Sequence, residues 1–179
     1  GGLNLKRDPG EISWMKTDMA AAASVAAAVI AAAALGGSGP LHAVLPVAEN
    51  MPGGGAQRPG DVVRHPDGRT TEVVDTDSEG RLVLADALAW LARSRPARLI
   101  DVGTLTDSGA VGTAFWGCWG TSSAVAAELL AAGAAVADPG WRLPLHDSYR
   151  ELIASRVADV ANCSTEVPDT VQAAERPVL

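Results

Sequence analysis

A strand, an acidic turn and a helix follow one another between positions 71 and 95, and this order constrains the fold strongly. The β-branched residues from Thr71 to Val74 predict a strand, and apolar residues at helical spacing from Leu82 to Arg95 predict a helix. Between them, Asp77 and Glu79 are separated by one residue. In an extended backbone residues i and i+2 point to the same side, about 7 Å apart. We therefore expect both carboxylates on one edge, with Arg81 continuing that edge.

Two interpretations of this acidic turn stay open on spacing alone. The separation of the carboxylates suits a pair of divalent ions, which lie about 3.5–4 Å apart in dinuclear hydrolases. Alternatively, the turn is an ordinary solvated connection in which Glu79 stabilises the N-terminus of the following helix.

Helix and strand signals alternate along the rest of the chain. The pattern predicts a strand over Ala43–Ala48, a β-hairpin over Asp61–Val74, strands over Arg98–Val102 and Phe115–Trp119, and a helix over Ser122–Ala135. This alternation predicts an α/β domain in which helices flank a mixed, largely parallel central sheet. Sites in such sheets form at the carboxyl ends of strands, and the acidic turn follows a predicted strand.

An alanine-rich stretch from Met19 to Leu35 runs for 17 residues without a charge. It is shorter than the about 20 residues that a membrane span needs. We expect a tightly packed, buried helix that ends at the glycine-rich segment 36–40, and no membrane association.

Composition excludes several classes of protein. The formal net charge of −7 argues against a nucleic-acid-binding protein, which would carry a basic patch. The two cysteines, Cys118 and Cys163, cannot build a disulfide framework and form no Cys-x-x-Cys metal site. The three histidines lack the His-Glu-x-x-His spacing, which excludes zinc proteases of that type.

Several blocks of sequence match one protein family in the same order. They are Gly1–Lys6 (Gly-Gly-Leu-Asn-Leu-Lys), Met15–Met19 (Met-Lys-Thr-Asp-Met), Ala48–Pro52, Arg58–Asp61, Asp75–Leu82, Ile100–Thr106 and Trp141–Leu145. Together they resemble the leucyl (cytosol) aminopeptidases, the M17 metallopeptidase family. The family signature reads Asn-Thr-Asp-Ala-Glu-Gly-Arg-Leu, from which Asp75 and Ser78 depart. The resemblance implies a partial aminopeptidase catalytic domain over 1–162, followed by a divergent polar tail over 163–179.

The resemblance also implies roles for individual side chains. Asp18, Asp77 and Glu79 fall on ligand positions for two divalent metal ions, manganese or zinc. Lys6 falls on the lysine that stabilises charge on the substrate carbonyl. Arg81 falls on the arginine that holds a bicarbonate ion as general base.

The remaining implications concern the substrate and the assembly. Met15, Thr104 and Leu105 fall near the substrate and are expected to contact it. The resemblance implies release of N-terminal, preferably apolar residues from peptides by a metal-activated water, in a cytoplasmic homo-oligomer, a hexamer in the family.

Two hypotheses about activity remain open. In the family, a lysine and an aspartate that complete the metal site precede the Gly-Gly pair and lie outside these 179 residues. Alanines at 20 and 21 replace a usual glycine pair, and Asp107 stands where glycine is usual. The chain is therefore either part of an active aminopeptidase, inactive by itself, or a non-catalytic homologue that keeps the fold as a binding or assembly module.

Overall fold

The computed structural model describes residues 6, 8–37, 39–106 and 110–164. Residues 1–5 of the first motif, Asp107 and positions 165–179 of the predicted tail lie outside the described residues. The chain divides into two units, Gly1–Leu105 with Ser155–Cys163, and Thr106–Ala154 with Ser164–Leu179. The first unit is therefore built from two separate stretches of sequence.

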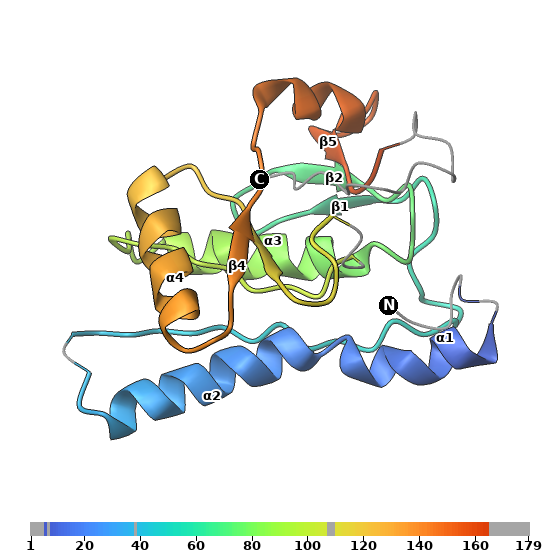
Figure 1. Ribbon diagram of the computed structural model, residues 1–179. Helices are drawn as coiled ribbons and strands as arrows, with labels where there is room; N and C mark the ends of the chain where they lie inside the picture. The colour runs from blue at the N-terminus through green and yellow to red at the C-terminus, as the bar shows by residue number, and fades with distance from the viewer. Residues whose placement is uncertain (1–5, 7, 38, 107–109, 165–179) are drawn as a thin grey trace. The chain divides into compact units, whose positions relative to one another are not determined.

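The first unit contains a three-stranded mixed sheet (Figure 1). Its strands are β1 (Val62–Arg64), β2 (Thr70–Glu72) and β5 (Val160–Ala161), in the order β1-β2-β5. β1 pairs antiparallel with β2, and β2 pairs parallel with β5. The α/β class with mixed strand pairing is confirmed.

The predicted hairpin between positions 61 and 74 is confirmed, with Val63 opposite Thr71. Its turn is closed by hydrogen bonds from His65 N to Arg69 O (2.8 Å) and from Gly68 N to His65 O (2.9 Å). Gly68 has φ +93°, a conformation that residues with a Cβ adopt only at a cost. The Pro-Asp-Gly sequence thus fixes this turn locally.

The helix after the acidic turn, α3 (Glu79–Ala92), begins three residues before the predicted start at Leu82. The backbone between β2 and α3 is a turn, so the prediction that Asp77, Glu79 and Arg81 share one extended edge is wrong. The cause is local, because the Asp75 carboxylate accepts a hydrogen bond from Asp77 N and turns the chain.

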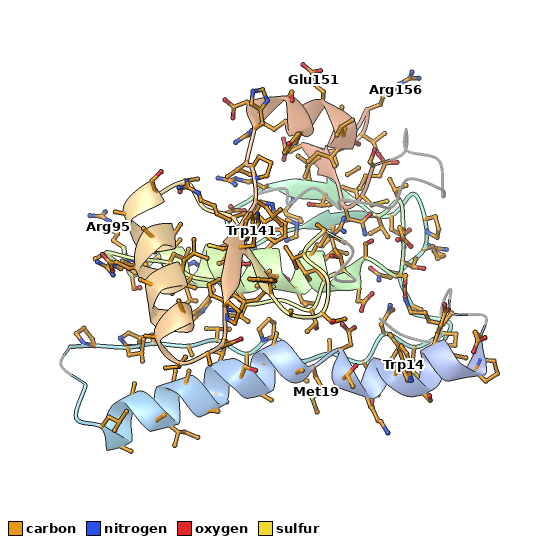
Figure 2. All side chains as sticks on the ribbon, viewed as in Figure 1. Trp14, Met19, Arg95, Trp141, Glu151 and Arg156 are labelled. Carbon is orange, nitrogen blue, oxygen red and sulfur yellow. The ribbon has the colours of Figure 1, made fainter. Side chains whose placement is uncertain are left out.

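The alanine-rich helix α2 (Ala20–Ala34) has nearly the predicted extent and follows α1 (Pro9–Trp14) and the 3₁₀ helix η1 (Met15–Thr17). The prediction that it is buried is wrong, because none of its residues is buried. Figure 2 shows the side chain of Met19 pointing away from the ribbon, and it is 58% exposed. Alanine adds little apolar area, so a nearly uniform alanine helix has no strong stripe to bury. By length and composition alone, the helical stretch Pro9–Ala34 could also cross a membrane.

Two predicted strands, 43–48 and 98–102, are not assigned to any sheet in the described part of the chain. Those two strand predictions are wrong, and the described strands form a three-stranded sheet and a two-stranded sheet. Segment 43–48 instead lies against α3, where Val44, Ala48 and Trp90 help line an open apolar pocket of about 390 Å³. Pro46, in the middle of this segment, has no N–H to donate to a neighbouring strand.

The second unit contains a parallel strand pair, β3 (Trp116–Cys118) with β4 (Gly140–Arg142), the helix α4 (Ser123–Ala135) and the 3₁₀ helix η2 (Asp147–Ile153). The predicted strand over 115–119 and helix over 122–135 are confirmed. Ser122 caps α4 by accepting a hydrogen bond from Val125 N. A Cβ on Gly140 would lie 2.5 Å from the Trp116 ring. Glycine is therefore required where β4 packs against this indole.

Candidate active site

The turn between β2 and α3, residues 74–79, is here called the carboxylate loop. Its backbone is held by the side chain of Asn162, which is 4% exposed. Asn162 Oδ1 accepts from Val74 N (2.9 Å) and Asp75 N (3.2 Å), and its Nδ2 donates to Asp75 O (2.6 Å) and Ser78 O (3.3 Å). One buried amide from a distant part of the sequence therefore fixes the loop's conformation.

The two departures from the family signature contact each other within this loop. The Ser78 hydroxyl donates to Asp75 Oδ2 (2.9 Å), and Asp77 N donates to Asp75 Oδ1 (2.9 Å). The Asp75 carboxylate thus acts inside the loop, with both oxygens engaged. The Ser78 side chain makes no cap hydrogen bond to α3.

Asp77 is the carboxylate that Lys6 contacts. Lys6 Nζ lies 2.5 Å from Asp77 Oδ2, and each of the two side chains is 21% exposed. The other oxygen, Asp77 Oδ1, is buried, and among the buried side-chain N and O atoms of the described residues it is the one without a hydrogen-bond partner. A buried, charged oxygen without a partner carries a large desolvation cost, which a bound cation would offset.

The charge on Lys6 is stabilised by its surroundings. Burial lowers the pKa of Lys6, whereas the hydrogen bond to Asp77 and the negative charge of Asp77 raise it. The carboxylates of Glu11 and Asp18 act in the same direction, and the pKa of Lys6 rises above its ordinary value of 10.5. Lys6 therefore stays an ammonium ion across the neutral range, within the field of Asp18 and Asp77.

Glu79 lies in the first turn of α3, where the helix dipole favours a negative charge. Asn50 Nδ2 donates to Glu79 Oε2 (2.9 Å) and also to Thr76 O (2.8 Å). Gln57 Nε2 donates to the same Thr76 carbonyl at 3.2 Å. Asn50 and Gln57 lie between segment 43–48 and the hairpin. Together they donate hydrogen bonds to the loop backbone, and Asn50 also donates one to the Glu79 side chain.

Arg81 lies on α3, and its Nη1 donates to the backbone carbonyl of Asn162 at 2.8 Å. Arg81 lies in the first turn of the helix, whereas Asp77 lies in the turn before it. The structure therefore does not place the two residues on a common extended edge. The same residue, Asn162, therefore holds the carboxylate loop through its side chain and the guanidinium through its backbone.

The other three predicted site residues contact either Asp18 or the start of α3. Thr104 Oγ1 donates to Asp18 O (2.5 Å) and Asp18 Oδ1 (3.0 Å), which joins the predicted substrate segment to a predicted ligand. Leu105 lies against the start of α3, because a Cβ on Gly80 would lie 2.9 Å from its side chain. Met15 begins η1, and its carbonyl accepts from Asp18 N at 3.0 Å.

The predicted metal ligands are not gathered around one point. Among the described residues, no group of three or more His, Cys, Asp or Glu side chains is arranged to hold a metal ion. The Lys6 ammonium instead supplies the positive charge next to Asp77. The partnerless Oδ1 of Asp77 nevertheless fits a divalent cation, and carboxylate oxygens are the ligands that such ions take.

The sequence alone did not single out Asn50 and Asn162, the two amides that hold this site. Both lie in or at the end of stretches that match the family, Asn50 in the block Ala48–Pro52. A neutral amide within a block that matches the family is the sequence signal that could have indicated them. An amide can donate a hydrogen bond to a carboxylate without neutralising its charge.

Comparison with known proteins places the chain. A model of the cytosol aminopeptidase family, catalytic domain, matches residues 1–175. Probable cytosol aminopeptidases from Ralstonia nicotianae and Burkholderia ambifaria are 46% and 45% identical over 177 residues, which is 97% of this chain. The chain spans about a third, 35%, of the length of these curated relatives.

Solved structures agree with these sequence matches. The bottromycin maturation enzyme BotP in complex with Mn is 44% identical, with a TM-score of 0.80 over 97% of this chain and 39% of that one. The cytosol aminopeptidase from Coxiella burnetii is 35% identical, with a TM-score of 0.79 over 92% of this chain and 36% of that one. The chain therefore belongs to the cytosol aminopeptidase family and carries part of its catalytic domain.

Proposed function

We propose that the protein to which this chain belongs is a metal-dependent aminopeptidase that releases N-terminal residues, preferably apolar ones, from peptides. The observation that carries the proposal is the state of Asp77, which has Lys6 on one oxygen and no partner on its other, buried oxygen. Family membership and a manganese complex of a 44% identical relative support it.

The residues of this chain would divide the work in the following way. Asp18, Asp77 and Glu79 would hold two divalent ions, manganese or zinc, with their carboxylate oxygens. Bound ions of this kind lower the pKa of water and polarise a carbonyl group. Lys6 would keep its proton and stabilise the negative charge that develops on the substrate carbonyl oxygen.

The other site residues would position the reactants. Arg81, held by the Asn162 carbonyl, would bind a bicarbonate ion that serves as general base. Met15, Thr104 and Leu105 would contact the substrate. We further propose that the protein acts on peptides in the cytoplasm as a homo-oligomer, and the names of its cytosol aminopeptidase relatives support that location.

A chimera tests this function directly. This chain would replace the matched third of the Ralstonia relative, and hydrolysis of leucine p-nitroanilide would be measured with added Mn²⁺. We expect turnover that a chelator abolishes. The Glu79→Gln chimera should be nearly inactive, because a neutral amide cannot offset the charge of a metal ion.

The same experiment addresses the alternative of a non-catalytic module. The separation of the carboxylates among the described residues is the observation that favours that alternative. A folded chimera with no chelator-sensitive turnover, beside an active Ralstonia parent, would reject the aminopeptidase proposal.

A further inference from the structure

Asn50 makes two hydrogen bonds that together fix Glu79 relative to the carboxylate loop. A side-chain amide nitrogen has two N–H groups. In Asn50, Nδ2 donates to the Thr76 carbonyl (2.8 Å) and to Glu79 Oε2 (2.9 Å). The first contact attaches the amide to the loop backbone, and the second attaches the Glu79 carboxylate to the amide.

The contact with Glu79 differs in kind from a packing contact. A hydrogen bond to an ionised carboxylate is shorter and about twice as strong as one between neutral groups. Thr76 is 5% exposed, so the carbonyl to which Asn50 is attached belongs to a buried part of the loop. The Asn50 amide therefore links Glu79 Oε2 to the buried Thr76 carbonyl.

We propose that Asn50 is a positioning residue that orients the Glu79 carboxylate for cation binding, a role that rests on the proposed metal-dependent function. Hydrogen-bond partners of metal ligands fix the direction of the ligand's lone pairs, and their loss lowers metal affinity or activity about 10–100-fold. Without Asn50, Glu79 would keep its place in α3 and lose the hydrogen bond that ties its Oε2 to the loop.

Gln57 provides a matched control. Like Asn50 it is half-buried, and its Nε2 donates to the same Thr76 carbonyl at 3.2 Å. This hydrogen bond of Gln57 does not involve Glu79. Gln57→Ala removes support from the loop backbone alone, whereas Asn50→Ala removes that support and the contact with the carboxylate.

The first measurement is the affinity of the full 179-residue chain for Mn²⁺. Electron paramagnetic resonance detects the free ion and so gives the bound fraction. We expect Asn50→Ala to weaken Mn²⁺ binding at least tenfold relative to wild type, and Gln57→Ala to change it less than threefold. Thermal unfolding of each variant identifies any that fail to fold.

The second measurement needs no metal ion and no substitution of Asn50. In Glu79→Ala, nuclear magnetic resonance should show the side-chain amide protons of Asn50 moving upfield and exchanging faster with water. In Gln57→Ala they should keep their wild-type positions. Unchanged Asn50 amide signals in Glu79→Ala would overturn the proposal even if Asn50→Ala does not fold.

The outcomes separate the two proposals. If wild type binds Mn²⁺ and Asn50→Ala binds it equally well, the role of Asn50 is rejected and the aminopeptidase proposal stands. If the wild-type chain and the Ralstonia chimera both fail to bind Mn²⁺, the metal-dependent function is rejected, and the role of Asn50 with it.

Discussion

In the carboxylate loop, hydrogen-bond partners give neighbouring aspartates different tasks. Asp75 uses both oxygens inside the loop, on Asp77 N and on the Ser78 hydroxyl. Asp77 has Lys6 on one oxygen and no partner on the other. Asp75 is thus a structural residue of the loop, whereas Asp77 keeps one buried oxygen without a hydrogen-bond partner.

The contact between Asp75 and Ser78 predicts that substitutions at these two positions are coupled. Ser78→Ala leaves Asp75 Oδ2 without its hydroxyl donor and should lower the free energy of unfolding by about 1–3 kcal/mol. The double variant Asp75→Asn with Ser78→Ala restores the family signature. Its loss in unfolding free energy should be smaller than the sum of the losses in the two single variants by at least about 0.5 kcal/mol. Urea denaturation measures this. As a control, Asp75→Asn with Ser123→Ala should be additive, and additivity in both pairs would refute the coupling.

The Lys6 contact predicts a pH dependence of stability. The pKa of Lys6 is raised in the folded state, so the ion pair stabilises the fold below the ordinary lysine pKa of 10.5. This contribution is lost as the pH rises through the raised pKa. The difference in unfolding free energy between wild type and Lys6→Met should be constant between about pH 7 and 9 and shrink above 10.5.

Urea denaturation at a series of pH values gives this difference. Lys16→Met, which removes an exposed lysine of η1, is the control for the change in net charge. A difference for Lys6→Met that stays constant or grows above pH 11 would contradict the assignment.

The sequence predicts a set of site residues, but it could not predict how they are arranged. The motifs named Lys6, Asp77 and Glu79 without showing which partners they have. The contacts of Asn162 with the loop cross 88 and 87 positions of sequence, and no local pattern reports such a pairing. The extended-edge prediction failed because the Asp75 carboxylate bends the backbone, which is a side-chain effect that spacing rules ignore.

At the scale of elements, local chemistry decides which predictions succeed. The hairpin has a Pro-Asp-Gly turn and α4 has a serine cap, and both were found because their signals lie within a few residues. Segments 43–48 and 98–102 carry strand-like composition but are unassigned to a sheet. A parallel strand is defined by its neighbours, which composition cannot supply.

The hairpin turn predicts a specific effect of a single methyl group. Gly68 has φ +93° and no atom within 4 Å of a Cβ built on it, so Gly68→Ala introduces backbone strain without a collision. We expect a loss of about 1–2 kcal/mol in the free energy of unfolding, measured by urea denaturation. Gly53 also has open space around its Cβ position, and its φ is not positive. Gly53→Ala should therefore be nearly neutral, and an equal loss in both variants would reject the strain argument.

At the scale of the molecule, the chain exposes apolar surface along α2. Only 6% of the most apolar window in Pro9–Ala34 is buried, Ile30 is 70% exposed, and Leu35, which follows the helix, is 86% exposed. Contiguous exposed apolar surface promotes association with other surfaces. The isolated chain therefore exposes an apolar helix to solvent.

This surface predicts self-association of the 179-residue chain. Sedimentation velocity should show species larger than a monomer at micromolar concentration, and Ile30→Lys with Leu35→Lys should shift the chain toward the monomer. Ser24→Lys adds a charge at an exposed position of the same helix without removing a large apolar side chain. It should have little effect, and a wild-type chain that stays monomeric at 100 μM would contradict the prediction.

The dependence of the carboxylate loop on Asn162 has a consequence for the order of events during synthesis. A ribosome makes residues 74–79 long before it makes position 162, and proteins begin to fold from the N-terminus as they emerge. Until the later segment arrives, the loop lacks the amide that sets its shape. Contacts between distant residues also form slowly, because a long loop must close first. The nascent chain therefore acquires the final geometry of its carboxylate loop late, well after Asp75 and Asp77 have been synthesised.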